Sequence, residues 1–173
     1  MVASPPSVLI VDDEPLARSR LKALCERTQL FRTIESANGG RQALEKIKQL
    51  EPDVLLLDVD MPDLSGLKVA ELCGSMARIP QIIFTTAHNK YAVQAFRLEV
   101  TDYLLKPVKE ALLREAVERA ITNLARGHEE HEPDVAQRLW VQDGTGSLQL
   151  MVSHIEWVEA ERDYMRLYLP GRS

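Results

Sequence analysis

The fold of this chain is decided by one stretch, Pro52-Asp53-Val54-Leu55-Leu56-Leu57-Asp58-Val59-Asp60-Met61-Pro62. Residues 54–57 form an unbroken apolar run bounded by turn residues, which predicts a short strand buried on both faces of a parallel sheet. The run ends in an acid, Asp58, and Pro62 and Gly66 then turn the chain. Open α/β sheets bind their ligands at the carboxyl ends of strands, so Asp58 is the first candidate site residue. For a lone acid the better interpretation would be the start of a solvated loop, so the assignment depends on the rest of the chain.

Length and composition are those of a globular protein with a substantial core. The chain has 173 residues, of which 45% are hydrophobic and 27% are charged, and these are ordinary values for a globular domain. No apolar run approaches the roughly 20 residues that cross a bilayer, and Val8–Val11 is too short for the apolar segment of a signal peptide. We therefore expect a cytoplasmic protein with no membrane partner. Cys25 and Cys73 stand apart in helical patterns and are expected to be buried thiols.

Strand and helix patterns alternate along the first two thirds of the chain. The alternation predicts a parallel sheet with helices on both faces, joined by right-handed crossovers. Apolar runs predict strands over residues 7–11, 31–37, 54–58, 81–85 and 102–105. Apolar residues at helical spacing predict helices over 15–28, 43–50, 64–76, 91–96 and 113–124.

The class of structure changes near residue 127. Residues 4–126 carry the α/β pattern, residues 127–136 are polar and read as a linker, and residues 137–173 hold short strand patterns separated by turns. Those strands are expected over 139–142, 148–152, 155–160 and 164–169. The third segment falls below the roughly 40 residues that an independent core needs, so we expect it to be only part of a domain.

Polar groups follow four of the predicted strands, where each strand ends. They are Asp12-Asp13, Asp58, Thr85-Thr86-Ala87 and Lys106-Pro107, and in a parallel sheet these ends meet at one edge. Three carboxylates brought together repel one another unless a cation lies among them. Hard carboxylate oxygens suit Mg²⁺, and an ammonium and a hydroxyl nearby suit a phosphoryl group. The set therefore predicts phosphoryl transfer onto a carboxylate nucleophile.

These motifs, in this order and spacing, resemble the receiver domain of two-component response regulators over about residues 7–126. The resemblance rests on Leu9-Ile10-Val11-Asp12-Asp13-Glu14-Pro15, Leu57-Asp58-Val59-Asp60-Met61-Pro62 with Gly66, Phe84-Thr85-Thr86-Ala87 and Asp102-Tyr103-Leu104-Leu105-Lys106-Pro107. Residues 152–165 resemble the opening strands of a LytTR-type DNA-binding domain, and residues 15–18 and 91–96 also resemble that LytR/AlgR subfamily. The resemblance implies a flavodoxin/CheY-like, doubly wound fold with five parallel strands in the order 2-1-3-4-5.

The resemblance also implies a magnesium site and a phosphoacceptor. Asp58 accepts the phosphoryl group. Asp13 and Asp58 bind Mg²⁺ directly together with the backbone carbonyl of Asp60, and Asp12 binds it through water. The residues themselves leave an alternative for Asp12 and Asp13, because acids before Pro15 also suit a helix N-terminus.

The same resemblance assigns a switch. Lys106, whose bond to Pro107 is expected to be cis, pairs with Asp58 and later with the phosphoryl oxygens. Thr86 supplies the hydroxyl that moves onto the phosphoryl group, and Tyr103 turns inward when it does. Alternation along the strand lets only one of Thr85 and Thr86 face the site, and the resemblance favours Thr86. Tyr103 could instead be a half-buried strand aromatic.

Two further residues are candidates for tuning the phosphoryl lifetime. Asp60 lies two residues beyond Asp58, and His88 lies two residues beyond Thr86. For His88 an ordinary place on a surface loop is an equally good interpretation.

The sequence thus predicts a response regulator rather than a true enzyme, with only self-catalysed phosphoryl transfer and slow autodephosphorylation. A sensor histidine kinase would supply the phosphoryl group, and homodimerisation through the face of the fourth helix, fifth strand and last helix would switch transcription by a LytTR domain. Two alternatives stay open. One is a phosphohydrolase of the haloacid dehalogenase type using Asp58 and Asp60, although Pro62 and the third-strand position depart from that pattern. The other is a receiver that acts by protein contact alone.

Binding of DNA is expected for a longer parent protein and not for this chain as given. A LytTR-type domain needs about 100 residues, and residues 137–173 provide far fewer. Residues 127–173 also contain 9 acids and 4 bases, so they carry the whole net charge of -5. A negative segment is unsuited to contact with phosphates.

Overall fold

The structure is a computed structural model that describes residues 5–88, 98 and 100–126 and the backbone of four strands within 138–168. The chain divides into two compact units, Met1–Gly127 and His128–Ser173. The first unit contains a five-stranded parallel sheet in the order β2-β1-β3-β4-β5, which confirms the predicted fold class and strand order. Its strands are β1 (Ser7–Val11), β2 (Thr33–Ala37), β3 (Val54–Asp58), β4 (Gln81–Thr86) and β5 (Asp102–Leu105).

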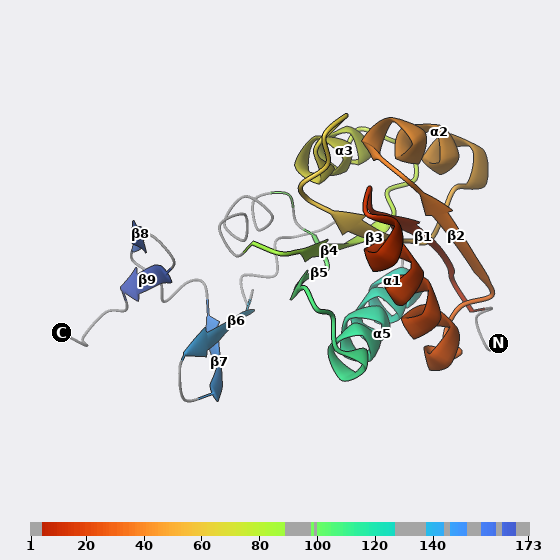
Figure 1. The fold of residues 1–173 in the computed structure, drawn as a ribbon. Coiled ribbons are helices and arrows are strands. Elements are labelled where there is room, and N and C mark those ends of the chain that lie inside the picture. Colours follow the sequence, from red (N-terminus) through yellow and green to blue (C-terminus); the bar gives the residue numbers. More distant parts are fainter. Residues whose placement is uncertain are drawn as a thin grey trace. The chain divides into compact units, whose positions relative to one another are not determined.

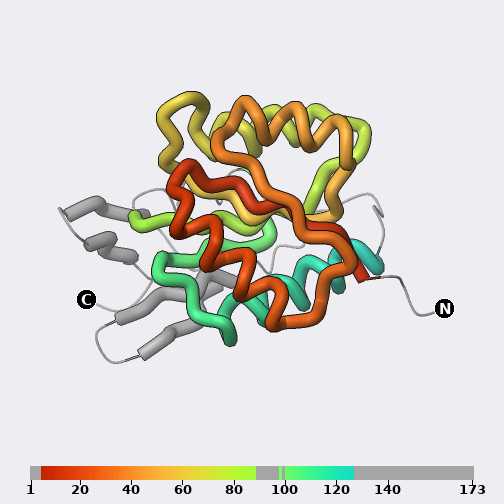
Figure 2. Tube along the Cα trace, turned by 45° about the vertical axis from the view of Figure 1, so that its right-hand side comes forward, coloured from red at the N-terminus to blue at the C-terminus, as the bar shows by residue number. Residues whose placement is uncertain are grey.

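The helices of the first unit cover both faces of this sheet. Figures 1 and 2 show α2 (Gly40–Leu50) and α3 (Gly66–Cys73) on one face, and α1 (Pro15–Thr28) and α5 (Glu110–Arg126) on the other. The helix predicted over 91–96 lies outside the described residues. None of the helices described is long and apolar enough to cross a membrane.

The central strand β3 separates two apolar cores. Every residue of β3 is buried, and its alternating side chains enter opposite layers. Leu55 and Leu57 pack in the core beneath α2 and α3, whereas Val54 and Leu56 pack in the core beneath α1 and α5. This two-sided burial is why the strand reads as a continuous apolar run instead of an alternating one.

The observed helix α3 is shorter at both ends than the predicted one. The pattern predicted residues 64–76, but the helix spans Gly66–Cys73. Its start is set by Ser65, whose side-chain oxygen accepts a hydrogen bond from the Lys68 amide at 3.3 Å. Leu64 and Met76 instead pack as partly buried side chains against the core outside the helix. Apolar spacing alone therefore overestimated the helix, because flanking loop residues share its apolar face.

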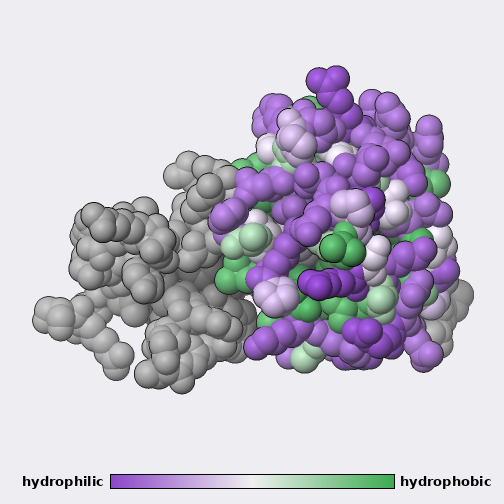
Figure 3. Space-filling model, viewed as in Figure 1, coloured by the Kyte–Doolittle hydropathy of each residue, from purple (hydrophilic) through white to green (hydrophobic). Residues whose placement is uncertain are grey.

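The surface of the first unit is mostly hydrophilic in the view of Figure 3, with scattered apolar side chains. Leu16 of α1 and Leu112 of α5 are among the large apolar residues that are exposed, at 68% and 40%. Single exposed apolar residues are normal for globular proteins and do not by themselves mark an interface.

Cys25 and Cys73 are buried, as expected, and burial raises their thiol pKa values to about 12 and about 11.

The amino edge of the sheet is held by a buried acid, Asp53. One carboxylate oxygen accepts hydrogen bonds from the Ser7 amide at 2.7 Å and the Ser7 hydroxyl at 2.8 Å. Arg32 and Arg78 also donate to this carboxylate. Burial opposes its ionisation, but the Ser7 hydrogen bonds and the two arginine charges outweigh burial and lower the pKa of Asp53 below 3.8. Asp53 therefore joins β1, β3 and two loops at the edge opposite the candidate site.

The second unit contains two antiparallel hairpins. One pairs β6 (Arg138–Asp143) with β7 (Gly146–Met151), and the other pairs β8 (Trp157–Glu161) with β9 (Tyr164–Tyr168). These strands lie where turn residues and apolar runs predicted them, to within two residues at most ends. Among the residues described, those of the second unit are therefore antiparallel strands, whereas those of the first unit alternate between strands and helices.

Candidate functional site

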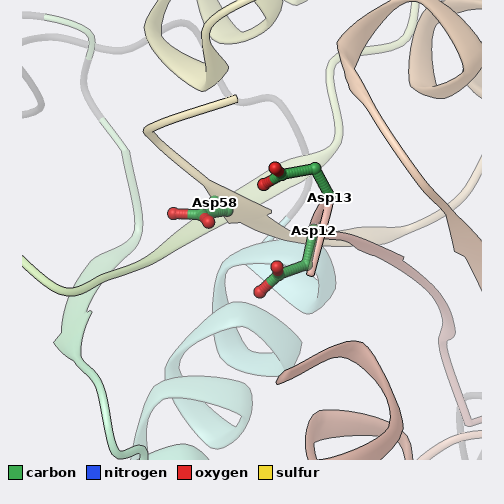
Figure 4. Close-up of side chains that lie close together, drawn as sticks. All are labelled: Asp12, Asp13 and Asp58. Atoms are coloured by element: carbon green, nitrogen blue, oxygen red, sulfur yellow. The ribbon is translucent and has the colours of Figure 1, made fainter. Parts of the chain in front are cut away.

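Three carboxylates converge at the carboxyl edge of the sheet. Asp12 and Asp13 directly follow β1, and Asp58 is the last residue of β3. Because β1 and β3 are paired neighbours with Val11 opposite Leu57, the two strands deliver their acids to the same place. One carboxylate oxygen from each acid lies within 4.8 Å of the others. Figure 4 shows the three side chains close together. Asp12 and Asp58 are buried, whereas Asp13 is exposed to solvent.

A single ammonium lies between the two buried acids of this cluster. Lys106 Nζ lies 2.8 Å from Asp12 Oδ2 and 2.8 Å from Asp58 Oδ2. The lysine follows β5, its amide donates to the Thr86 carbonyl at 2.8 Å, and its bond to Pro107 is cis, as the sequence predicted. Lys106 thus reaches the acids from the end of a third strand. The structure therefore brings together Asp12, Asp13, Asp58 and Lys106.

The charges in this cluster do not balance. Burial raises the pKa of Asp58, the negative charge of Asp12 raises it further, and Lys106 opposes both effects. Burial disfavours the charged form of Lys106, but its hydrogen bonds to Asp12 and Asp58 raise its pKa above 10.5. Among the residues that the structure describes, three carboxylates and one ammonium in this cluster leave an excess of negative charge on hard oxygen atoms. This donor set fits a divalent cation such as Mg²⁺.

Asp12 also organises the start of α1. Its Oδ1 accepts a hydrogen bond from the Glu14 amide at 2.9 Å, Arg18 donates to its carbonyl at 2.6 Å, and its amide donates to Ala37 at 3.2 Å. One oxygen of Asp12 therefore fixes the backbone just before α1, although no side chain caps the helix itself, while the other oxygen faces Lys106. One side chain performs both tasks.

The carboxylate of Asp60 is not part of the cluster of three acids. Its Oδ2 lies 3.7 Å from His88 Nε2, whereas its amide lies 3.4 Å from Asp58 Oδ1. The cluster of described acids contains Asp12, Asp13 and Asp58 but not the Asp60 side chain. The backbone of Asp60 is therefore next to Asp58, and its partly exposed side chain lies near His88.

Hydrogen bonds through the backbone of His88 connect Thr86 with Tyr103. The His88 amide donates to Thr86 Oγ1 at 3.2 Å, and the Tyr103 hydroxyl donates to the His88 carbonyl. The Tyr103 ring also packs edge-on against Phe84, with centroids 6.3 Å apart. Sequence reasoning identified all three residues but missed this connection, because it runs through main-chain atoms that any residue at position 88 provides.

Thr85 lies beside Asp58 in the sheet register and is fully buried. Its hydroxyl has no hydrogen-bond partner among the residues described, whereas the hydroxyl of Thr86 accepts the His88 amide. Adjacent strand residues face opposite sides of a sheet, so the two threonines have different surroundings. Thr85 is an unpaired polar group, and such a group reduces stability.

We expect opposite effects when each threonine is replaced by valine, which keeps the shape and removes the hydroxyl. Thr85→Val should raise the free energy of unfolding by about 1 kcal/mol, because an unpaired buried hydroxyl is lost. Thr86→Val should lower it by about 1 kcal/mol, because the His88 amide loses its acceptor. Urea unfolding of both variants tests this, and destabilisation of the two variants by the same amount would contradict it.

The comparisons with known proteins agree with this geometry. Residues 8–118 match the family model described as "Response regulator receiver domain". The chain is 46% identical over 115 residues to the positive alginate biosynthesis regulatory protein of Pseudomonas aeruginosa, covering 66% of this chain and 46% of that protein. It is 43% identical over 111 residues to the sensory transduction protein LytR of Staphylococcus epidermidis, covering 64% and 44%. The chain spans about half the length of these two relatives.

Two further comparisons cover more of the matched protein. The chain is 33% identical to an uncharacterized response regulatory protein of Vibrio cholerae, covering 94% of this chain and 69% of that one. The response regulatory domain of protein mrkE from Klebsiella pneumoniae superposes with a TM-score of 0.64 at 32% identity, covering 69% of this chain and 98% of that structure.

Proposed function

Because the chain belongs to the family of response regulator receiver domains, we propose that it accepts a phosphoryl group on Asp58. The observation that carries this proposal is the ion pair of Lys106 with both Asp58 and Asp12. This ion pair supports the proposal because Asp58 Oδ2 lies 2.8 Å from a positive charge at the end of a strand. A sensor histidine kinase is the proposed donor in the cell.

The acceptor chemistry follows from the carboxylate of Asp58. One oxygen attacks the phosphorus of a phosphohistidine, an oxygen–phosphorus bond forms, and the phosphorus–nitrogen bond breaks with its electron pair kept by the imidazole. Lys106, which neutralises Asp58 before transfer, then pairs with the phosphoryl oxygens. We assign Mg²⁺ to the carboxylates of Asp13 and Asp58 and the carbonyl of Asp60, with Asp12 acting through water. When bound, the ion neutralises negative charge on the transferring oxygens.

The proposed switch uses the connection through His88. A phosphoryl group on Asp58 offers new acceptor oxygens to the hydroxyl of Thr86. When this hydroxyl moves toward them, it no longer accepts the hydrogen bond from the His88 amide. The backbone of His88 can then move. The Tyr103 hydroxyl no longer finds the His88 carbonyl in place to accept its hydrogen bond. Phosphorylation thereby favours a second arrangement of these side chains, as a ligand favours the state that it contacts best. Asp60 and His88, paired at the surface, tune how long the phosphoryl group lasts.

The proposed output is homodimerisation that controls transcription. The last helix and fifth strand, α5 and β5, form part of the proposed dimer face, and a complete LytTR domain in the longer parent protein would bind DNA. We propose residues 4–126 as the receiver, 127–136 as the linker and 137–173 as the start of that domain. One matched relative is named as a positive regulatory protein of alginate biosynthesis and another as a sensory transduction protein, which supports a regulatory output for the parent. Residues 127–173, with 9 acids and 4 bases, are unsuited to hold DNA alone.

Phosphate release separates a receiver from a phosphohydrolase. With a small acyl phosphate and Mg²⁺ we expect at most one phosphoryl group per chain at any time, and with para-nitrophenyl phosphate no sustained release of nitrophenol. A phosphohydrolase needs its second acid facing the acceptor, whereas Asp60 faces His88. Continuous turnover of the ester at a rate proportional to protein concentration would contradict the receiver and favour the haloacid dehalogenase alternative.

A further inference from the structure

The loop that follows the acceptor strand is fixed at both of its ends. We call residues 59–65 the acceptor loop. The Gly66 amide donates to the Val59 carbonyl at 2.9 Å, which closes the base of the loop. The side chains of Val59 and Met61 are buried in the core at 1% and 7% exposure. Asp60, whose carbonyl is a proposed metal ligand, lies between these two anchors.

A third anchor joins the acceptor loop to a different helix. Asp63 Oδ1 accepts a hydrogen bond from the Gly40 amide at 3.0 Å, and Oδ2 accepts one from the Arg41 amide at 2.9 Å. Both amides belong to the first turn of α2, where amides have no partner within the helix. The residue before the helix, Gly39, makes no side-chain cap. The hydrogen bonds, led by that from Arg41, lower the pKa of Asp63, so it is ionised at neutral pH.

Two glycines allow the acceptor loop to lie directly on the backbone of α2. A Cβ atom at Gly39 would lie 2.8 Å from Asp63 Oδ1, and one at Gly40 would lie 2.4 Å from the Leu64 carbonyl oxygen. Real Cβ atoms do not approach neighbours this closely, so a side chain at position 40 would push the loop away. The acceptor loop and α2 therefore touch through main-chain atoms, and the Asp63 side chain makes the hydrogen bonds between them.

The same turn is tied to the acid cluster from the other side. Asp12 donates its amide to the carbonyl of Ala37, which is the last residue before the turn that leads to Gly39 and Gly40. Asp63 thus completes a ring of contacts that passes from Asp12 through the end of β2 and the start of α2 to the acceptor loop. Opening the ring at Asp63 frees the loop relative to the acids on the opposite side.

We infer that Asp63 is a positioning residue, which holds the acceptor loop so that the Asp60 carbonyl and the clustered acids keep the spacing that Mg²⁺ requires. The inference rests on the proposed magnesium site and adds to it a residue outside the acid cluster. Residues that orient metal ligands typically contribute about 10-fold or more in metal affinity. Asp63 acts through the backbone, and each of its carboxylate oxygens accepts a hydrogen bond from an amide of α2.

Direct magnesium titration by calorimetry on the unphosphorylated chain tests this inference. We expect Asp63→Ala to weaken magnesium binding about 10-fold and Asp63→Asn, which keeps one acceptor oxygen, to weaken it only about threefold. Both variants remove the same charge, so their difference reports the hydrogen bond. If both variants weaken magnesium binding equally, the effect comes from the lost charge. If Asp63→Ala binds magnesium with wild-type affinity, Asp63 has no effect. Either result overturns the inference.

A second variant separates positioning from helix stability. In Gly39→Ser with Asp63→Ala, the serine caps α2 locally but cannot hold the acceptor loop. We expect the melting temperature lost in Asp63→Ala to return while magnesium affinity stays low. Asp53→Asn, which loosens the opposite edge of the sheet, should leave magnesium affinity within about twofold of wild type. Recovery of magnesium affinity in the double variant would overturn the inference. A wild-type chain without saturable magnesium binding would contradict the proposed function itself.

Discussion

Asp58→Ala is expected to abolish magnesium-dependent labelling of the chain by a radiolabelled acyl phosphate. The substitution removes the proposed nucleophile, and we expect neither Asp12 nor Asp60 to replace it. Asp12 stays bonded to the Glu14 amide and to Lys106, and Asp60 faces His88. Labelling should therefore fall to the background of the protein without Mg²⁺.

The fold should survive this substitution. Lys106 keeps Asp12 as a partner at 2.8 Å, and removing one of two buried carboxylates relieves repulsion between them. Asp60→Ala is the matched control, because it removes a nearby acid that is not the proposed acceptor, and it should still be labelled. Circular dichroism checks that each variant is folded. Wild-type labelling of a folded Asp58→Ala protein would remove Asp58 from the mechanism.

Asp53→Asn is expected to lower the free energy of unfolding by about 2–3 kcal/mol at pH 7, because hydrogen bonds to a charged and buried group are among the stronger ones. The carboxylate receives hydrogen bonds from Ser7, Arg32 and Arg78, and asparagine keeps the shape but loses the charge. Glu35→Gln is the control: the pair of Glu35 with Lys46 is partly exposed and should contribute at most about 1 kcal/mol.

The stability that Asp53 provides should depend on pH in one direction. Its folded-state pKa lies below the ordinary value of 3.8, so the folded protein favours the ionised form. The difference in unfolding free energy between wild type and Asp53→Asn should be full and constant well above pH 3.8. It should shrink as the pH falls below 3.8 through the lower folded-state pKa. Urea unfolding across this range measures it, and a difference that grows on acidification would contradict the assigned role.

The sequence predicted the sheet well because its strongest signals are local. The run Val54–Leu57 is buried on both sides, and the polar residues after four strands needed only the rule that parallel strand ends share an edge. That rule is enough to bring Lys106 to Asp58 across 48 residues of sequence. The same reasoning could not show how those groups are bonded, for example that one ammonium contacts two acids.

Contacts between loops were beyond the reach of sequence patterns. The turn at residues 38–40 was recognisable, but nothing in its sequence indicates that Asp63 caps the following helix. Asp53 likewise looks like an ordinary turn acid before a strand, and its four donors come from three distant segments. Such bonds depend on how loops from separate crossovers meet, which neither periodicity nor turn chemistry specifies. The register pairs Asp58 with Thr85, so the assignment of the switch hydroxyl to Thr86 stays a prediction.

Locating the phosphoryl group on the chain is the most direct test of the acceptor site. The protein is incubated with an acyl phosphate and Mg²⁺, trapped by borohydride reduction of the acyl phosphate, digested, and mapped by tandem mass spectrometry. We predict a single modified side chain, Asp58, and no modification when Mg²⁺ is removed by chelation. Modification of another aspartate, or a histidine phosphate in place of an acyl phosphate, would contradict the acceptor site at the end of β3.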